Sequence, residues 1–271
     1  VQVAGDDVPA HPAIAQMGEG GKAPEILRIK SDLLLKLGDY AGAKTLFESV
    51  LAARSVPWAR TGLGKVYFHQ GQYEMARNQF RQVLEENRMF IEAADWLAKT
   101  YDAMGDKPQA QQVLQAAVKL SPNSAYRQRA LGETALRNGA LDVAQSAFEK
   151  TIQISEFSSN KHPAAYVALA RVLSENDNPE EALKLLKRTN EVFKDSKDSV
   201  NIAIQAAAVQ SAVHHKAGQA EEAQAAMAQV EALLASHADK ASPQTAMEVA
   251  QSMLALGRKE QACALMRNLV K

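Results

Sequence analysis

The sequence predicts an all-α chain that forms a right-handed superhelical solenoid of about seven antiparallel helix pairs. First, a turn residue followed five positions later by alanine occurs seven times along the 271 residues. Second, 46% of the residues are hydrophobic but only 6% are aromatic. Alanine allows helices to approach closely, whereas strands favour β-branched and aromatic residues. Third, helix-capping sequences stand where the pattern expects helices to begin.

The recurring turn is glycine in six copies and aspartate in one. Consecutive turns are separated by 33, 34, 34, 38, 41 and 39 residues, counted between positions 38, 71, 105, 139, 177, 218 and 257. A period of this size indicates stacked supersecondary units. The copies are Gly38…Ala43, Gly71…Ala76, Gly105…Ala110, Gly139…Ala144, Asp177…Ala182, Gly218…Ala223 and Gly257…Ala262.

Large and small residues recur in register with this turn. Nine residues after it stand Phe47, Phe80, Leu114, Phe148, Leu186, Met227 and Met266. Seven residues before it, small residues such as Gly64, Ala98 and Gly132 allow the first helix of a pair to approach the second. We expect the large side chains to fill the space between neighbouring pairs, with Met227 and Met266 as core residues. Cys263, beside the core position Ala262, is expected to pack as a small hydrophobe.

The registered pattern resembles the signature of the tetratricopeptide repeat family. The resemblance implies that stability comes from stacking of neighbouring pairs, because one pair leaves an apolar face uncovered. Residues 1–23, rich in glycine and proline, are expected to form a linker or a frayed lead-in to a solenoid over 24–271. Its regular repeats are predicted at 24–56, 57–90, 91–124 and 125–160, and its divergent repeats at 163–195, 199–237 and 242–271.

Local sequence supports the helix boundaries. Pro122 is expected to end one helix and Ser124 to cap the next. Asn178 precedes Pro179 in the order expected of an N-cap, and Ser242 precedes a proline in the same way. Residues 199–217 form an alanine-rich helix that departs from the repeat, so we expect the last two pairs to pack with a different rotation.

Composition argues against several other function classes. Lys+Arg and Asp+Glu both number 31, so the basic surplus typical of nucleic-acid binding is missing. The longest apolar runs are too short to cross a membrane. A single cysteine provides neither a disulfide nor a thiolate cluster. The adjacent His214 and His215 point to different faces of a helix, which disfavours a metal site. We therefore expect no catalytic residues, no cofactor and no metal.

A protein or peptide partner is the remaining expectation. In tetratricopeptide repeats the first helices line the concave groove, and the equivalent positions here mix aromatic and charged residues. An extended peptide or a helix could bind there, although charged helix faces also commonly face only water. The carboxylate clamp for chaperone tails is not expected, because Asp32, Lys65, Lys99 and Glu133 occupy its positions. The candidate partner-binding residues are Trp58, Lys65, Phe68, Asp95, Lys99, Asp102, Tyr126, Arg129, Glu133 and Arg171.

Several stretches are similar to the tetratricopeptide half of bacterial receiver-containing response regulators. They are 57–64, 95–98, 113–122, 127–133 and Asn138-Gly139. The resemblance implies a cytoplasmic output or adaptor module of two-component signalling. The phosphoacceptor receiver domain of such proteins is not part of this sequence. An adaptor for pilus or outer-membrane assembly is the alternative, and the residues that precede Val1 would discriminate between the two.

Overall fold

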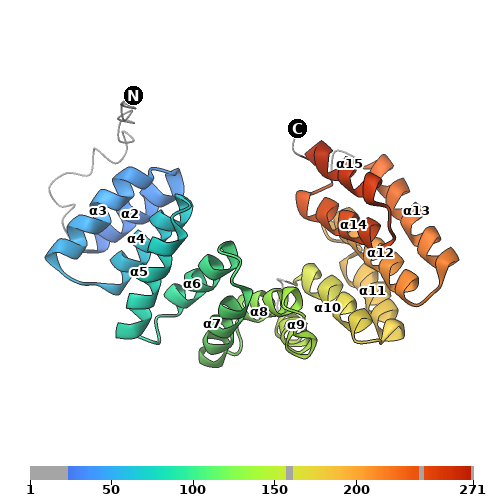
Figure 1. Ribbon diagram of the computed structural model, residues 1–271, viewed down its shortest axis with the longest axis horizontal. Helices are drawn as coiled ribbons and strands as arrows, with labels where there is room; N and C mark the ends of the chain where they lie inside the picture. The colour runs from blue at the N-terminus through green and yellow to red at the C-terminus, as the bar shows by residue number, and fades with distance from the viewer. Residues whose placement is uncertain (1–23, 157–160, 238–240, 270–271) are drawn as a thin grey trace. The chain divides into compact units, whose positions relative to one another are not determined.

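The fold consists entirely of helices in the residues that the computed structural model describes, 24–156, 161–237 and 241–269 (Figure 1). The all-α prediction is confirmed. The predicted linker, residues 1–23, lies outside the described part. The fourteen helices are α2 (Pro24–Leu37), α3 (Tyr40–Ala53), α4 (Pro57–His69), α5 (Tyr73–Glu86), α6 (Ile91–Ala103), α7 (Lys107–Leu120), α8 (Ala125–Arg137), α9 (Leu141–Glu156), α10 (Pro163–Glu175), α11 (Pro179–Phe193), α12 (Ser199–Lys216), α13 (Ala220–Ser236), α14 (Pro243–Ala255) and α15 (Lys259–Leu269).

The helices fall into two compact units, each described here by itself. The first, Val1–Ser121, contains α2 to α7, and the second, Pro122–Lys271, contains α8 to α15. Within each unit, consecutive helices form hairpins, and each hairpin packs against the next one. The boundary coincides with the proline-containing break between two pairs.

A left-handed backbone conformation at the turn residue closes each hairpin. All six turn glycines have φ between 72° and 79°, a region that is open to glycine because it has no Cβ. In the second hairpin, the amide of Gly71 donates to the carbonyl of Phe68, and the amide of Gln72 donates to the carbonyl of Tyr67. This is the Schellman pattern that ends a helix. Asp177 adopts the same conformation with φ 57°, which aspartate tolerates better than most residues.

A large side chain packed against a small residue joins the helices. A Cβ on Gly62 of α4 would lie 2.2 Å from the Phe47 ring of α3, in the preceding pair. A Cβ on Gly64 would lie 2.6 Å from Phe80 of its own pair. Phe47 and Phe80 are 1% and 0% exposed. The phenylalanines therefore occupy the volume that the absence of a Cβ provides, on both sides of α4.

The serine caps form as the sequence predicts. Ser124 accepts a hydrogen bond from the amide of Arg127, and Ser242 accepts one from the amide of Thr245, at 3.4 and 3.1 Å. Asn178 is the N-cap residue of α11, but its side chain makes no capping hydrogen bond.

Small and polar residues bring α14 against α12 in the second unit. Of the two helices in the preceding pair, α14 packs mainly on the first, α12, whereas α10 packs mainly on the second, α9. Gln205 of α12 donates to the hydroxyl of Thr245 at 3.0 Å, and Asn201 accepts from the same hydroxyl at 2.8 Å. The alanine-rich surface allows this approach, and it explains why 199–217 departs from the repeat pattern: Ala206, Ala207 and Ala208 are all buried.

Two residues of the last helix contradict their predicted burial. Cys263 is exposed, and the position six residues after the turn is not fully buried in any pair. Met266 is 37% exposed, whereas Met227 at the equivalent position is fully buried. Met227 shares a core cluster with Val249 and Ala250 of the following pair, and α15 is the last of the described helices.

The packing of Phe47 against Gly62 gives a testable consequence. Gly62→Ala should lower the free energy of unfolding by about 1–3 kcal/mol, although alanine favours a helix, because the new Cβ overlaps the ring. Urea unfolding followed by circular dichroism would measure this change. Adding Phe47→Leu should recover part of the loss, and a fully additive double variant would contradict the proposed overlap.

Candidate protein-binding site

Trp96 of α6 is the centre of an aromatic cluster in the first unit. Its ring contacts Phe68 edge-on at 5.3 Å between centroids and stacks with Phe80 at 6.4 Å. The ammonium groups of Lys65 and Lys99 lie 5.6 and 4.5 Å from the Trp96 centroid, within the range of cation–π attraction. Three of the predicted groove residues, Lys65, Phe68 and Lys99, therefore come together around a tryptophan that the groove prediction did not include.

The other predicted residues of the first unit lie around this cluster or apart from it. Trp58 packs edge-on against Phe47 at 6.2 Å and belongs to the hydrophobic core between the first two pairs. Its ring is only partly exposed. On α6, Asp95 is partly buried and Asp102 is exposed. The structure thus gives Trp58 a packing role, while the lysines and the two aspartates remain on the accessible side of α4 and α6.

In the second unit, the predicted residues of α8 form a charged surface. Tyr126 is 42% exposed. Arg129 forms an ion pair with Glu133 one turn later along the helix. Arg129 also lowers the pKa of the His162 imidazole, although burial is the larger cause of that lowering. His162 is the N-cap residue of α10, so α8 and the start of α10 are electrostatically coupled.

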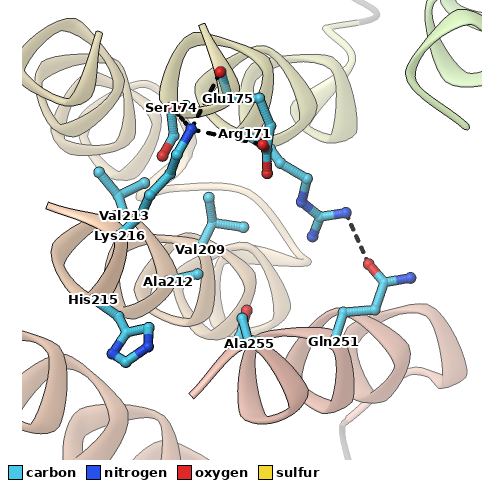
Figure 2. Close-up of a pocket in the computed structure, with 11 residues that line it drawn as sticks. Arg171, Ser174, Glu175, Val209, Ala212, Val213, His215, Lys216, Gln251 and Ala255 are labelled. Atoms are coloured by element: carbon cyan, nitrogen blue, oxygen red, sulfur yellow. Dashed lines mark hydrogen bonds and ion pairs between the residues drawn. The ribbon is translucent and has the colours of Figure 1, made fainter. Parts of the chain in front are cut away.

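A pocket of about 440 Å³ lies between α10, α12 and α14 (Figure 2). Val209 and Val213, each 1% exposed, contribute to its apolar lining together with Ala212 and Ala255. The volume falls within the range of pockets that enclose ligand groups. The pocket is lined by the first helices of three consecutive pairs, which is the position that the sequence analysis assigned to a binding groove.

Arg171 and Lys216 form the polar rim of this pocket. Arg171 forms an ion pair with Glu248 and donates to Gln251 at 2.8 Å, so α10 is tied to α14 across the opening (Figure 2). Lys216 of α12 donates to the carbonyl oxygens of Ser174 and Glu175, at 2.8 and 3.1 Å. These are the last carbonyls of α10, where a cation satisfies acceptors that the helix leaves free.

The rim charges are largely neutralised by the protein itself. Arg171 is paired with Glu248, and Lys216 lies 3.2 Å from Asp177 and 3.7 Å from Glu175. A ligand that carries a strong charge would have to displace one of these partners. An apolar side chain, by contrast, would cover Ala212 and Ala255 and leave the ion pairs intact. The pocket therefore favours an apolar group with polar surroundings.

Most of the pocket residues were not among the candidates from the sequence. Arg171 was predicted, whereas Val209, Val213 and Lys216 were not. The available signal was the alanine-rich stretch 199–217, which the sequence analysis identified as a departure in packing but not as a site. The direct approach of α14 to α12 depends on tertiary contacts that the repeat pattern does not show.

The described residues contain no group of three or more His, Cys, Asp and Glu side chains placed to hold a metal ion. His214 instead contacts Gln219, with 2.6 Å between Nδ1 and the amide oxygen. None of the helices in the described ranges has both the length and the apolar character needed to span a lipid bilayer.

Comparison with family models identifies the repeats. One model described as Tetratricopeptide repeat matches residues 34–95 and 135–207, and a second with the same description matches 97–159. Together these matches extend over well more than half of the chain. A search of curated proteins finds no match.

Solved structures share the fold at low sequence identity. A tetratricopeptide repeat protein from Parabacteroides merdae ATCC 43184 is 16% identical, with a TM-score of 0.66 over 90% of this chain and 91% of that one. A putative kinesin light chain with TPR-like repeats from Podosopora anserina is 22% identical, with a TM-score of 0.56 over 66% and 94%. MamA from Desulfovibrio magneticus RS-1 is 17% identical, with a TM-score of 0.56 over 64% and 96%.

The environment of His162 predicts a pH dependence. Because burial and Arg129 lower its pKa below the ordinary value of 6.5, the unfolded chain binds this proton more readily than the folded chain. The associated stability is fully present above pH 6.5 and is lost as the pH falls below that value. His162→Gln should flatten this acid-side decline in thermal unfolding curves, whereas His215→Gln, at an exposed position on α12, is the control. Equal slopes in wild type and His162→Gln would contradict the assignment.

Proposed function

Since the chain belongs to the tetratricopeptide repeat family, we propose that it is a non-catalytic scaffold that binds a peptide or helix of another protein along its first helices. Repeat proteins of this family generally act in protein–protein interaction, and their stacked helices present extended binding surfaces. The bound segment inserts an apolar side chain into the pocket between α10, α12 and α14. No nucleic acid and no cofactor take part in this proposal.

The observation that carries the proposal is the combination of an apolar lining and an internally paired rim. Ala212 and Ala255, which line the pocket beside the buried Val209 and Val213, offer an apolar surface on which an aliphatic or aromatic side chain gains burial. Arg171, fixed by Glu248 and Gln251, keeps α10 and α14 in place before a ligand arrives. Preorganisation of this kind reduces the ordering cost of binding. A second hollow of about 190 Å³ shares Ser174, Val213 and Lys216, so the surface continues past the lysine.

The Trp96 cluster is a second contact surface for the same function, considered within the first unit alone. Lys99 is exposed and lies over the Trp96 ring, and Phe68 is only partly buried beside it. Tryptophan is enriched among the residues that anchor a protein partner. The flanking Asp95 and Asp102 add acceptors, so this surface suits a segment of mixed charge.

We further propose that the scaffold is the cytoplasmic output or adaptor module of a bacterial two-component response regulator. Support comes from the resemblance of 57–64, 95–98 and 127–133 to the repeat half of such regulators. The test is to sequence the gene upstream of the codon for Val1. An in-frame receiver domain with a phosphoacceptor aspartate would support the assignment. A lipoprotein signal would contradict it and favour an adaptor of pilus or outer-membrane assembly.

Selection from a random peptide library displayed on phage would test the binding surface directly. Peptides enriched on the wild-type chain should carry an apolar residue, and their affinity should fall at least about tenfold with Ala255→Glu, which places a charge in the pocket lining. Affinity can be measured by fluorescence polarisation with the synthetic peptide.

Two further variants locate the binding surface. Ala225→Glu, at an exposed position of α13, is the matched control and should bind as wild type. Lys99→Glu tests the Trp96 cluster, and it should weaken peptides that use the first unit without affecting those that use the pocket. Circular dichroism should show unchanged helical content in all three. Enriched peptides that bind every variant equally would contradict both proposed surfaces.

A further inference from the structure

The guanidinium group of Arg171 is held by its edge. It lines the pocket between α10, α12 and α14, where Nη1 donates to the amide oxygen of Gln251 at 2.8 Å (Figure 2). Nη2 donates to the Glu248 carboxylate. All five N–H bonds of a guanidinium lie in one plane. Both interactions therefore use the edge of the group and leave its two flat faces unused, while 28% of the side chain is accessible.

Small apolar residues and a second cation surround this group. Ala212 of α12 and Ala255 of α14 line the same pocket, and neither is fully buried. The second cation, Lys216, donates to the carbonyl oxygens of Ser174 and Glu175 at 2.8 and 3.1 Å. Among the described residues that line the pocket, Glu175 supplies the one carboxylate, which lies 3.7 Å from Lys216. The lining thus presents apolar surface next to positive charge.

This arrangement suits an aromatic ring better than the other classes of side chain. A carboxylate or phosphate needs the in-plane donors of Arg171, which Glu248 and Gln251 already occupy. A basic side chain would be repelled by Arg171 and Lys216. An aliphatic side chain gains burial against the alanines but has no electrostatic attraction to the guanidinium face. An aromatic ring gains the same burial, and its negative face attracts the cation.

We propose that the pocket takes an aromatic side chain of the bound segment, with the ring stacked on the face of Arg171. The inference rests on the proposed function and names the class of side chain that the partner supplies. Arg171 is the specificity-determining residue, whereas Glu248 and Gln251 are positioning residues that hold its guanidinium. Arginine suits this role better than lysine, because its head group is planar and more weakly hydrated. The volume of about 440 Å³ leaves room for a ring.

The test uses two capped amino acids as probes, N-acetylphenylalanine amide and N-acetylcyclohexylalanine amide. The two side chains are similar in size, but the saturated ring is more hydrophobic and has no π-face. An apolar pocket without stacking would bind the saturated probe at least as tightly. Stacking on Arg171 predicts instead that the phenylalanine probe binds about two- to fivefold more tightly. NMR titration of the full 271-residue chain would measure both affinities from the methyl signals of Ala212 and Ala255.

The Nε–H signal of Arg171 reports the stacking itself. The ring current of a stacked phenyl group should move this signal upfield, and the saturated probe should not. Arg171→Lys keeps a positive charge beside Glu248 but removes the planar face. The preference for phenylalanine should therefore disappear, while the cyclohexyl probe binds as before. Arg188→Lys, at an arginine of α11 that pairs with Glu156 and does not line the pocket, is the matched control and should retain the preference.

The outcomes separate this inference from the proposed function. Equal affinity for the two probes, or tighter binding of the cyclohexyl probe, would overturn the inference and leave an apolar binding pocket in place. So would an Arg171 signal that does not move, or a preference for phenylalanine that survives in Arg171→Lys. If neither probe moves the signals of Ala212 and Ala255, the pocket admits no apolar side chain. The proposed function of the pocket would then fail together with the inference.

Discussion

The stacking of the helices depends on close packing at small residues, with a large side chain of a neighbouring helix filling the space beside each, as at Gly62, Gly64 and Gly132. Gly62 and Gly64 lie on opposite sides of α4, one against Phe47 of the preceding pair and the other against Phe80 of its own. A larger residue in place of either glycine would push two helices apart. The next pair would shift as well, because each hairpin packs on its neighbour. The left-handed turn residue makes this possible by reversing the chain between the two helices of a pair.

Much of the fold could be predicted because these requirements are local and repeat in register. The turn at Gly71 and the small residue at Gly64 are both visible in the sequence, and Asp177 replaces glycine where its conformation allows. The end of the array was harder to predict. Cys263 stands at a position that no pair buries fully, and Met266 is 37% exposed although Met227 at the same position is buried. A periodic sequence specifies which face is apolar, not whether a neighbour covers it.

The candidate site was predictable only where it uses regular repeat positions. Lys65, Phe68 and Lys99 meet around Trp96 because equivalent positions on consecutive first helices are neighbours in the stack. The pocket of the second unit depends instead on the packing of α14 against α12, the first helix of the preceding pair, where α10 packs against the second helix, α9. That change comes from hydrogen bonds such as Gln205 to Thr245, between residues forty positions apart, which no local pattern encodes.

The burial of α12 on nearly all sides has a consequence for how the second unit opens. This helix packs on α10, α11, α13 and α14, whereas α2 in the first unit packs mainly on α3 and α4. Loss of α12 would remove support from three hairpins at once, so those hairpins should exchange their amide protons with solvent together, as one slow group. In the first unit, α2 packs mainly on α3 and α4, so its amide protons should exchange faster than those of α12. Within one family of repeats, the rate of opening would thus depend on how extensively a helix packs on its neighbours.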